Sequence, residues 1–234
     1  KSGSPRDIEL LCNQLHDFMK DILKPIIDDH LNKFIRSNLK KNLETNRGYS
    51  FTYDALPKEF NTYGACSRAL DSSIGKLYEL LIVELSKIYN EKTFTKYKDK
   101  TVDLGFERNG ITNILQIKLG GDLDKGKSEK EKEILEETKN LLEEDNKKVK
   151  TYIGIINNKN GYSQDLFQNE ISNWKQPNIQ KVFKEDEILV EKDLFYFITQ
   201  DKKVFPEFYE ITTEIIKPHM EIYLKGVKSK YGLW

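Results

Sequence analysis

The chain of 234 residues is 38% hydrophobic, so it can bury one core, or one core with a small annexe. Its 38 basic and 38 acidic side chains cancel, which excludes a strong overall field for polyanions and makes any nucleic-acid surface a local one. The two cysteines, Cys12 and Cys66, fit neither a disulfide framework nor a zinc-ligand spacing. With no secretory or bilayer-spanning apolar segment, we expect a cytoplasmic protein with no membrane association.

The first third of the chain is predicted to be mainly helical. Asp7 can cap a first helix with an apolar pattern at three- and four-residue steps up to Ile22. Pro25 suits the first turn of a second helix that continues to Leu39. Residues 44–68 break the pattern with aromatic and turn-forming residues, which indicates an irregular segment that is long for a compact domain.

A third helix is predicted over residues 72–89, where apolar residues form one stripe. Next comes the sequence VDLGFERNGITNILQIK, residues 102–118, which alternates like a half-buried hairpin. Asn109-Gly110 favours a two-residue turn, because both central positions of that turn need positive φ. This turn sets the predicted register, in which the following residues lie opposite each other: Arg108 and Ile111, Phe106 and Asn113, Leu104 and Leu115, Asp103 and Gln116, and Val102 and Ile117.

The second half alternates between helices and strands. The sequence Ser128-Glu-Lys-Glu131 has capping-box spacing and predicts the start of a charged helix. Strands are predicted at 151–156 and 193–199, and a last helix at 207–225. Strands separated by a crossover helix imply an α/β (α+β) fold with a mixed central sheet flanked by helices. We expect residues 1–67 to form a helical N-terminal extension with an aromatic loop, for dimerisation or DNA contact, and residues 68–234 to form the core with its C-terminal helix.

The hairpin collects Asp103, Gln116 and Lys118 on its polar face. Asp, Gln and Lys are ordinary residues for the solvent side of any hairpin. A mixed sheet with several helices, however, tends to be covered on both faces, which would turn this face into a cleft. Gly120-Gly121 would let a ligand approach, and the preceding helix offers the carboxylate of Glu79, with Glu84 ranked second because it lies nearer the apolar stripe.

Asp103 and the Gln116-Ile117-Lys118 triplet on the next strand, with a helical glutamate upstream, resemble the active-site hairpin of the PD-(D/E)XK nuclease superfamily. Within it the chain is most similar to a type II restriction endonuclease, and the resemblance covers residues 72–157 best. Two positions depart from the family motif, Val102 in place of Pro and Gln116 in place of an acidic residue. The second departure leaves open an inactive relative.

The resemblance implies a restriction-endonuclease-like core that binds Mg²⁺, with Mn²⁺ as a possible substitute and no organic cofactor. Asp103, Glu79, the Gln116 carbonyl and the Ile117 backbone carbonyl would hold the ion, as hard cations prefer oxygen ligands. Lys118 would orient the attacking water and stabilise the transition state. Asp103, Gln116, Lys118 and Glu79 are therefore the expected catalytic residues.

Other residues are candidates for DNA contact. Lysines that bracket the hairpin, and two residues of the aromatic segment, could meet phosphates or bases: Lys92, Lys96, Lys98, Lys100, Lys125, Lys127, Arg47 and Tyr49. The lysines are equally consistent with a solvated surface. The three histidines, His16, His30 and His219, show no metal-ligand spacing and are interpreted as ordinary helix or surface residues.

The expected function is a Mg²⁺-dependent, sequence-specific double-strand DNA endonuclease of the type II restriction class. It would leave 5′-phosphate and 3′-hydroxyl ends and act as a homodimer, because two identical sites match a palindrome. A structure-selective resolvase or repair nuclease on the same core is one alternative. A catalytically inactive DNA-binding or assembly protein is another.

Overall fold

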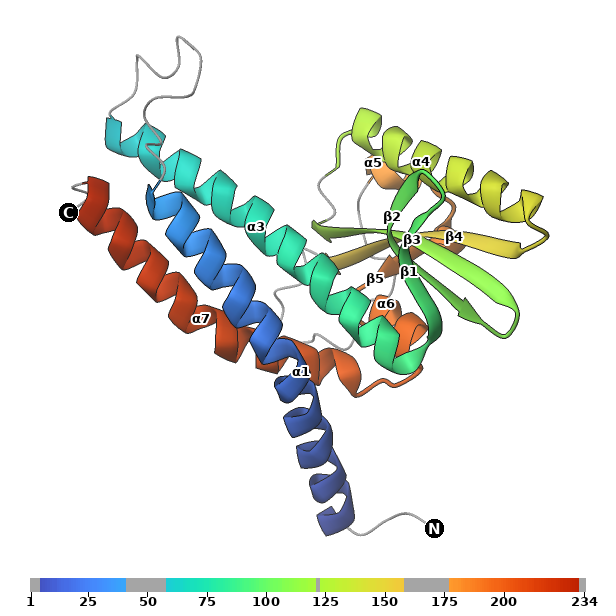
Figure 1. The fold of residues 1–234 in the computed structure, drawn as a ribbon, viewed down its shortest axis with the longest axis horizontal. Helices are drawn as coiled ribbons and strands as arrows, with labels where there is room; N and C mark the ends of the chain where they lie inside the picture. Colours follow the sequence, from blue (N-terminus) through green and yellow to red (C-terminus); the bar gives the residue numbers. More distant parts are fainter. Residues whose placement is uncertain (1–4, 41–57, 121–122, 158–176, 232–234) are drawn as a thin grey trace. The chain divides into compact units, whose positions relative to one another are not determined.

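A computed structural model describes residues 5–40, 58–120, 123–157 and 177–231. The chain divides into two compact units, one of residues 1–77 with 206–234 and the other of residues 78–205. We call them the helical unit and the sheet unit (Figure 1). The predicted boundary between residues 67 and 68 differs from these divisions, which fall within helices α3 and α7.

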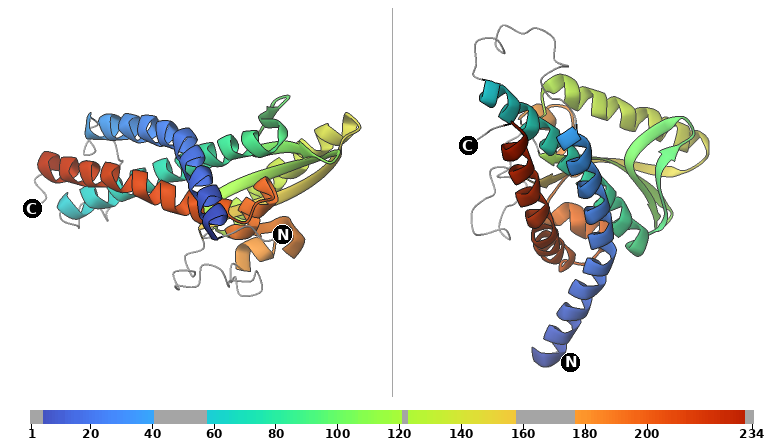
Figure 2. Two further views of the ribbon diagram at one scale, coloured as in Figure 1. Left: turned by 90° about the horizontal axis from the view of Figure 1, so that it is seen from below. Right: turned by 60° about the vertical axis from the view of Figure 1, so that its left-hand side comes forward.

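The helical unit contains α1 (Pro5–Lys40), the first part of α3 (Lys58–Tyr89) and most of α7 (Val204–Tyr231). The two helices predicted before residue 40 are one helix, with Pro25 inside it. Proline removes one backbone donor and bends a helix, and Figure 2 shows α1 bending along its length. Burial of Met19, Leu23, Ile27 and Leu31 on both sides of the proline holds the helix together.

Aromatic and small residues close the core of the helical unit. The rings of Phe34 and Tyr223 lie 5.1 Å apart between their centroids, and both side chains pack in a cluster with Ile35 and Val227. Gly226 brings α7 close to α1, because a Cβ atom there would lie 2.6 Å from Leu39 Cδ1. The N-terminal helix therefore packs on the C-terminal helix.

The helix predicted over 72–89 begins earlier, at Lys58. Residues 58–68 of the predicted irregular segment are thus helical, while residues 41–57 lie outside the described part of the chain. Cys66 lies in this helix and is buried.

The sheet unit is built on a five-stranded mixed sheet in the order β1-β2-β3-β4-β5. Its strands are β1 (Glu91–Tyr97), β2 (Lys100–Arg108), β3 (Ile111–Gly120), β4 (Lys148–Asn157) and β5 (Ile188–Val190). The pairs β1–β2 and β2–β3 are antiparallel, and the pairs β3–β4 and β4–β5 are parallel. The predicted mixed sheet flanked by helices is therefore confirmed, and β1 is an additional edge strand.

The register of the predicted hairpin is confirmed in three places, since Arg108 pairs with Ile111, Phe106 with Asn113 and Leu104 with Leu115. Val102 was predicted to lie opposite Ile117, but its side chain packs in the cluster that contains Ile114. The register between β1 and β2 shifts in this region, between the pair Phe94–Gly105 and the pair Lys96–Thr101. Such an irregularity changes the direction of side chains on the strand.

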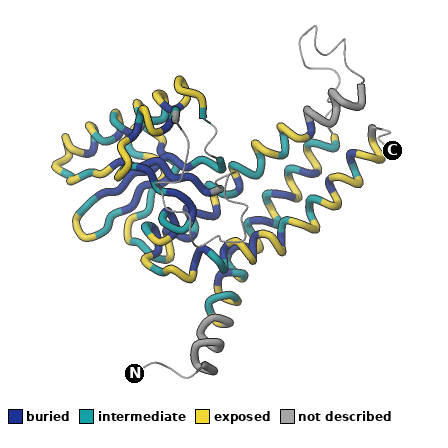
Figure 3. The backbone as a smooth tube through the Cα atoms, turned by 180° about the vertical axis from the view of Figure 1, so that it is seen from behind, coloured by how far each residue is buried: buried dark blue, intermediate teal, exposed yellow. Residues whose placement is uncertain are grey.

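Two helices cover opposite faces of the sheet (Figure 1). On one face, Leu135 and Leu142 of α4 (Lys125–Glu144) pack with apolar side chains of β3 and β4. On the other, Phe197 of α6 (Lys192–Thr199) contacts Phe106 and Tyr152, with ring centroids 5.7 and 4.6 Å apart. The central strands are consequently buried, as the dark blue segments of Figure 3 show. Short segments α5 (Pro177–Gln180) and η2 (Glu185–Glu187) complete the unit.

Two local predictions were wrong. Residues 193–199 form helix α6 and not a strand, because Leu194, Phe195, Ile198 and Thr199 are buried at helical spacing. The N-cap of α4 is Asp124, whose side chain accepts a hydrogen bond from Lys127 N, and not Ser128. Ser128 instead lies on the buried side of α4 and donates to the Asp124 carbonyl.

Candidate active site

Asp103 of β2 and Gln116 and Lys118 of β3 meet on the face of the sheet that α4 covers. Gln116 is only 3% exposed, and the Asp103 and Lys118 side chains are mostly buried. A hydrogen bond of 2.7 Å from Ile117 N to Asp103 Oδ2 fixes the carboxylate beside β3. The polar residues of the hairpin thus form a covered cluster and not a solvated face.

A fourth side chain, Glu131 of α4, completes this cluster. Its Oε1 lies 3.0 Å from Lys118 Nζ, which is 3.4 Å from Asp103 Oδ2. The ammonium group is therefore held between carboxylates of a strand and a helix. We call Asp103, Gln116, Lys118 and Glu131 the hairpin cluster.

The Gln116 amide lies against both carboxylates of the hairpin cluster. With its NH₂ group directed at them, it donates to Asp103 Oδ2 at 2.7 Å and to Glu131 Oε2 at 3.1 Å. With its oxygen in that position, three oxygens face one another with no proton between them. The first orientation satisfies the hydrogen bonds of the cation-free protein, and the second suits a bound cation.

The spacing of these oxygens fits a small divalent cation. Mg²⁺ binds oxygens at about 2.1 Å in octahedral geometry, so neighbouring ligand oxygens lie about 3 Å apart. The two separations, 2.7 and 3.1 Å, bracket that value. Asp103, Gln116 and Glu131 would therefore hold the ion, and this set includes Glu131, which the sequence analysis did not consider as a ligand.

Charge in the hairpin cluster determines the protonation of Lys118. Burial alone would lower the pKa of Lys118, but the carboxylates of Asp103 and Glu131 outweigh it, and the pKa is raised. The side chain is therefore a cation at neutral pH. It can stabilise negative charge, and it cannot accept a proton in this arrangement.

Of the two helical glutamates considered, Glu79 is the one whose charge reaches Lys118. It contributes to the raised pKa of Lys118, whereas Glu84 is paired with Lys87 on its own helix at 2.6 Å. Among the described residues, the one group of three ligand-type side chains within 4.8 Å of one another does not include Glu79, and its role as a metal ligand stays a prediction. Ile117 lies in β3 between Gln116 and Lys118, and the use of its carbonyl as a metal ligand stays a prediction.

Most lysines proposed for DNA contact are in ion pairs. Lys98 pairs with Asp145 at 3.0 Å, Lys125 with Glu129 at 3.4 Å and Lys127 with Asp124 at 3.2 Å. Lys92 and Lys100 likewise pair with glutamates on neighbouring strands or helices.

Lys96 is exposed and makes no ion pair within the described part of the chain. The proposed base-reading residues Arg47 and Tyr49 lie outside the described residues, as does Gly121.

Sequence reasoning missed Glu131 as a site residue and interpreted it only as part of a helix start. The usable signal was its phase, because residues 128, 131, 135, 138 and 142 follow three- and four-residue steps. All of these except Glu131 are the buried residues of α4. The sequence therefore already showed that Glu131 shares a stripe of the helix with Leu135 and Leu142, and the structure shows that this stripe faces the sheet.

The comparisons with known proteins add no assignment. Neither the family models nor the curated proteins gave a match to this chain. None of the helices in the described residues combines the length and the apolar character needed to cross a membrane.

Proposed function

We propose that the protein is a Mg²⁺-dependent endonuclease that hydrolyses phosphodiester bonds of double-stranded DNA, with a restriction-endonuclease-like core and a type II restriction role. The observation that carries this proposal is the hairpin cluster, in which two carboxylates, an amide and a lysine converge beneath a helix. The likeness of Asp103 and Gln116-Ile117-Lys118 to the PD-(D/E)XK motif supports the same reading.

In this proposal, each residue of the hairpin cluster has a role that follows from its chemistry. Asp103, Gln116 and Glu131 supply oxygens for Mg²⁺, for which Mn²⁺ can substitute, and the ion supplies a polarised water and positive charge near the scissile phosphate. Lys118 adds a fixed positive charge that acts most strongly on the negative charge developing in the transition state. Glu79 of α3 adds to the negative charge that raises the pKa of Lys118, and it remains a proposed catalytic residue and metal ligand.

Substrate access requires the hairpin cluster to change its internal contacts. Glu131 and Asp103 now neutralise Lys118, so binding of a cation by these carboxylates would free the ammonium group for a phosphate oxygen. The cation and the DNA are therefore expected to bind cooperatively.

Digestion of a plain plasmid with Mg²⁺, followed by sequencing of the ends, tests this function. Discrete fragments with 5′-phosphate ends and a common sequence at the cuts are expected. Cleavage confined to branched DNA would replace the restriction role by a resolvase or repair role. Metal-independent DNA binding without any cutting would identify an inactive relative and refute the proposal.

A further inference from the structure

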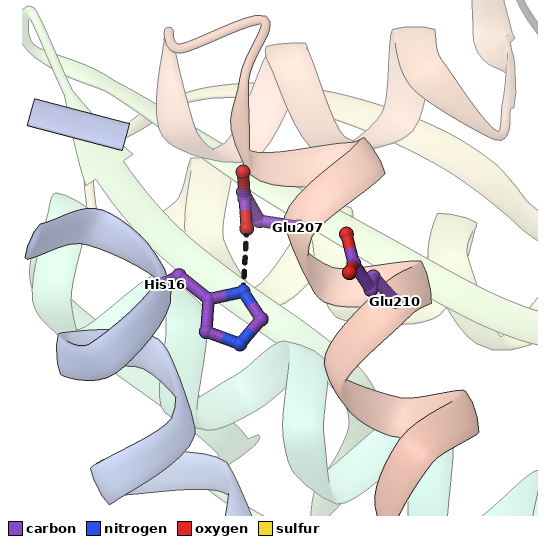
Figure 4. A group of neighbouring side chains, drawn as sticks. All are labelled: His16, Glu207 and Glu210. Atoms are coloured by element: carbon purple, nitrogen blue, oxygen red, sulfur yellow. Dashed lines mark hydrogen bonds and ion pairs between the residues drawn. The ribbon is translucent and has the colours of Figure 1, made fainter. Parts of the chain in front are cut away.

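A second group of ligand-type side chains lies in the helical unit. His16 of α1 and Glu207 and Glu210 of α7 point toward one another (Figure 4). Each offers one ligand atom, and these atoms all lie within 4.8 Å of one another. Among the described residues, this is the one group of three His, Cys, Asp or Glu side chains that meets this criterion. We call it the His16 cluster.

Helix periodicity explains why these residues meet. Glu207 and Glu210 are three residues apart and share one side of α7. His16 faces them across the two helices, with its Nδ1 2.8 Å from Glu207 Oε2. The site is therefore held by the packing of α1 on α7 and needs no loop to form it.

A neighbouring ion pair between α1 and α7 contains a lysine, which the His16 cluster does not. One turn after His16, Lys20 contacts both carboxylate oxygens of Glu214, at 2.7 and 2.9 Å. The hydrogen bond from Lys20 is the main reason that the pKa of Glu214 is lowered. Lys20 thus pairs with Glu214, whereas Glu207 lies against the imidazole of His16.

The charge and atom types of the His16 cluster define its ligand. A neutral imidazole with two carboxylates carries two negative charges, which one divalent cation balances. Imidazole nitrogen is a ligand for Zn²⁺ and its neighbours in the transition series, whereas Mg²⁺ and Ca²⁺ prefer oxygen alone. Glu210 is exposed, so water can reach the remaining coordination position.

We propose that His16, Glu207 and Glu210 bind one divalent transition-metal ion of the Zn²⁺ type, with water as a further ligand. The bound ion joins α1 to α7 across 191 positions of the sequence and thereby stabilises the helical unit. This proposal is independent of the nuclease function, because it uses none of the residues of the hairpin cluster.

Titration of the metal-free full chain with Co²⁺, followed by Zn²⁺, tests the proposal. Four-coordinate Co²⁺ with a nitrogen ligand absorbs visible light more strongly than octahedral Co²⁺ bound by oxygens, which separates this site from a Mg²⁺-type site. We expect one such ion per chain, its displacement by Zn²⁺, and a higher melting temperature with either metal. His16→Asn and Glu210→Gln should each weaken binding at least about tenfold, because even indirect partners of a metal contribute that much.

Matched variants make the outcome decisive. His219→Asn changes a histidine of α7 that contacts Asp28, away from the His16 cluster. Asp103→Asn changes the hairpin cluster. Both variants should keep the Co²⁺ absorption. Glu210 is exposed, so Glu210→Gln should fold even if His16→Asn does not. Absence of the four-coordinate spectrum in the parent, or its full retention in the folded Glu210→Gln variant, would overturn the proposal.

Discussion

At the scale of single residues, the Gln116 amide is the unusual component of the proposed site. A neutral amide can satisfy two carboxylates in the absence of a cation, because its NH₂ group donates to Asp103 and Glu131. A glutamate at this position would place a third carboxylate about 3 Å from the other two, which is costly in a buried site where the ammonium group of Lys118 already faces two carboxylates. Glutamine therefore favours a stable cation-free protein at the expense of cation affinity.

The variant Gln116→Glu tests this account. Without metal, we expect the free energy of unfolding to fall by roughly 2 kcal/mol or more at neutral pH, since the new carboxylate is buried beside two others. Mg²⁺ should recover most of this loss, and cleavage should continue at a lower Mg²⁺ concentration than the parent requires. Urea unfolding with and without Mg²⁺ measures the effect. The same exchange at exposed Gln14 is the control and should change neither quantity. Equal stability of Gln116→Glu and parent without metal would contradict the amide arrangement.

At the scale of helices and strands, the turn sequence and the alternation of residues predicted the hairpin. Tertiary packing decided between helix and strand where the local sequence suits both. Asn109-Gly110 fixes the turn and alternation fixes the faces, so Asp103, Gln116 and Lys118 could be brought together from sequence alone. Residues 193–199 are rich in aromatic and apolar residues that suit either structure, and burial against β4 selects the helix. Glu131 escaped notice because its role depends on which side of α4 meets the sheet.

The contact of α4 with the segment before β5 gives a pH prediction. Lys132 Nζ lies 2.8 and 2.9 Å from the two oxygens of Glu187. Burial alone would raise the pKa of Glu187, but hydrogen bonds from Lys132 and from Lys184 N outweigh it and lower the pKa. A carboxyl group with a lowered pKa in the folded state stabilises the protein above its ordinary pKa of 4.5, and this contribution is lost as the pH falls through the lowered value.

Glu187→Gln should therefore reduce the free energy of unfolding at pH 7 by about 1 kcal/mol. The difference from the parent should shrink as the pH falls from 4.5 through the lowered pKa of Glu187, because the parent then also loses the ionised group. Denaturant unfolding across pH 3 to 7, measured for both proteins, shows this convergence. Glu185→Gln changes an exposed neighbour and should follow the parent curve. A constant difference at every pH would mean that the ion pair does not contribute.

At the scale of the whole molecule, the balanced charge of the chain limits how it can bind DNA. The basic and acidic residues are equal in number, and most of the lysines near the hairpin are already paired with carboxylates. The proposed DNA binding would then depend on a few contacts and on the proposed cation more than on a general positive surface. Two copies of such a site on one duplex would add affinity that a single copy lacks.

Cutting both strands of a symmetric sequence is most simply done by a homodimer. Exposed apolar side chains remain on α1 and α7 of the helical unit, including Phe18 and Ile222, which are 49% and 57% exposed. We therefore keep the prediction that helices of this unit form the dimer interface. Sedimentation equilibrium should give a dimer, either free or on a cognate duplex. A monomer in both states would rule out this arrangement.

The central claim is that the hairpin cluster is a phosphodiester-cleaving site, and its most direct test compares cutting and binding on one duplex at one salt concentration. Asp103→Ala and Lys118→Ala should each lower the cleavage rate by roughly a hundredfold or more while DNA binding persists, because Asp103 would hold the Mg²⁺ ion and Lys118 would act mainly on the transition state. Asp99→Ala and Lys130→Ala, which change exposed residues of the same types, should cut like the parent. If a folded Asp103→Ala or Lys118→Ala variant cuts as fast as the parent, the hairpin cluster is not the active site.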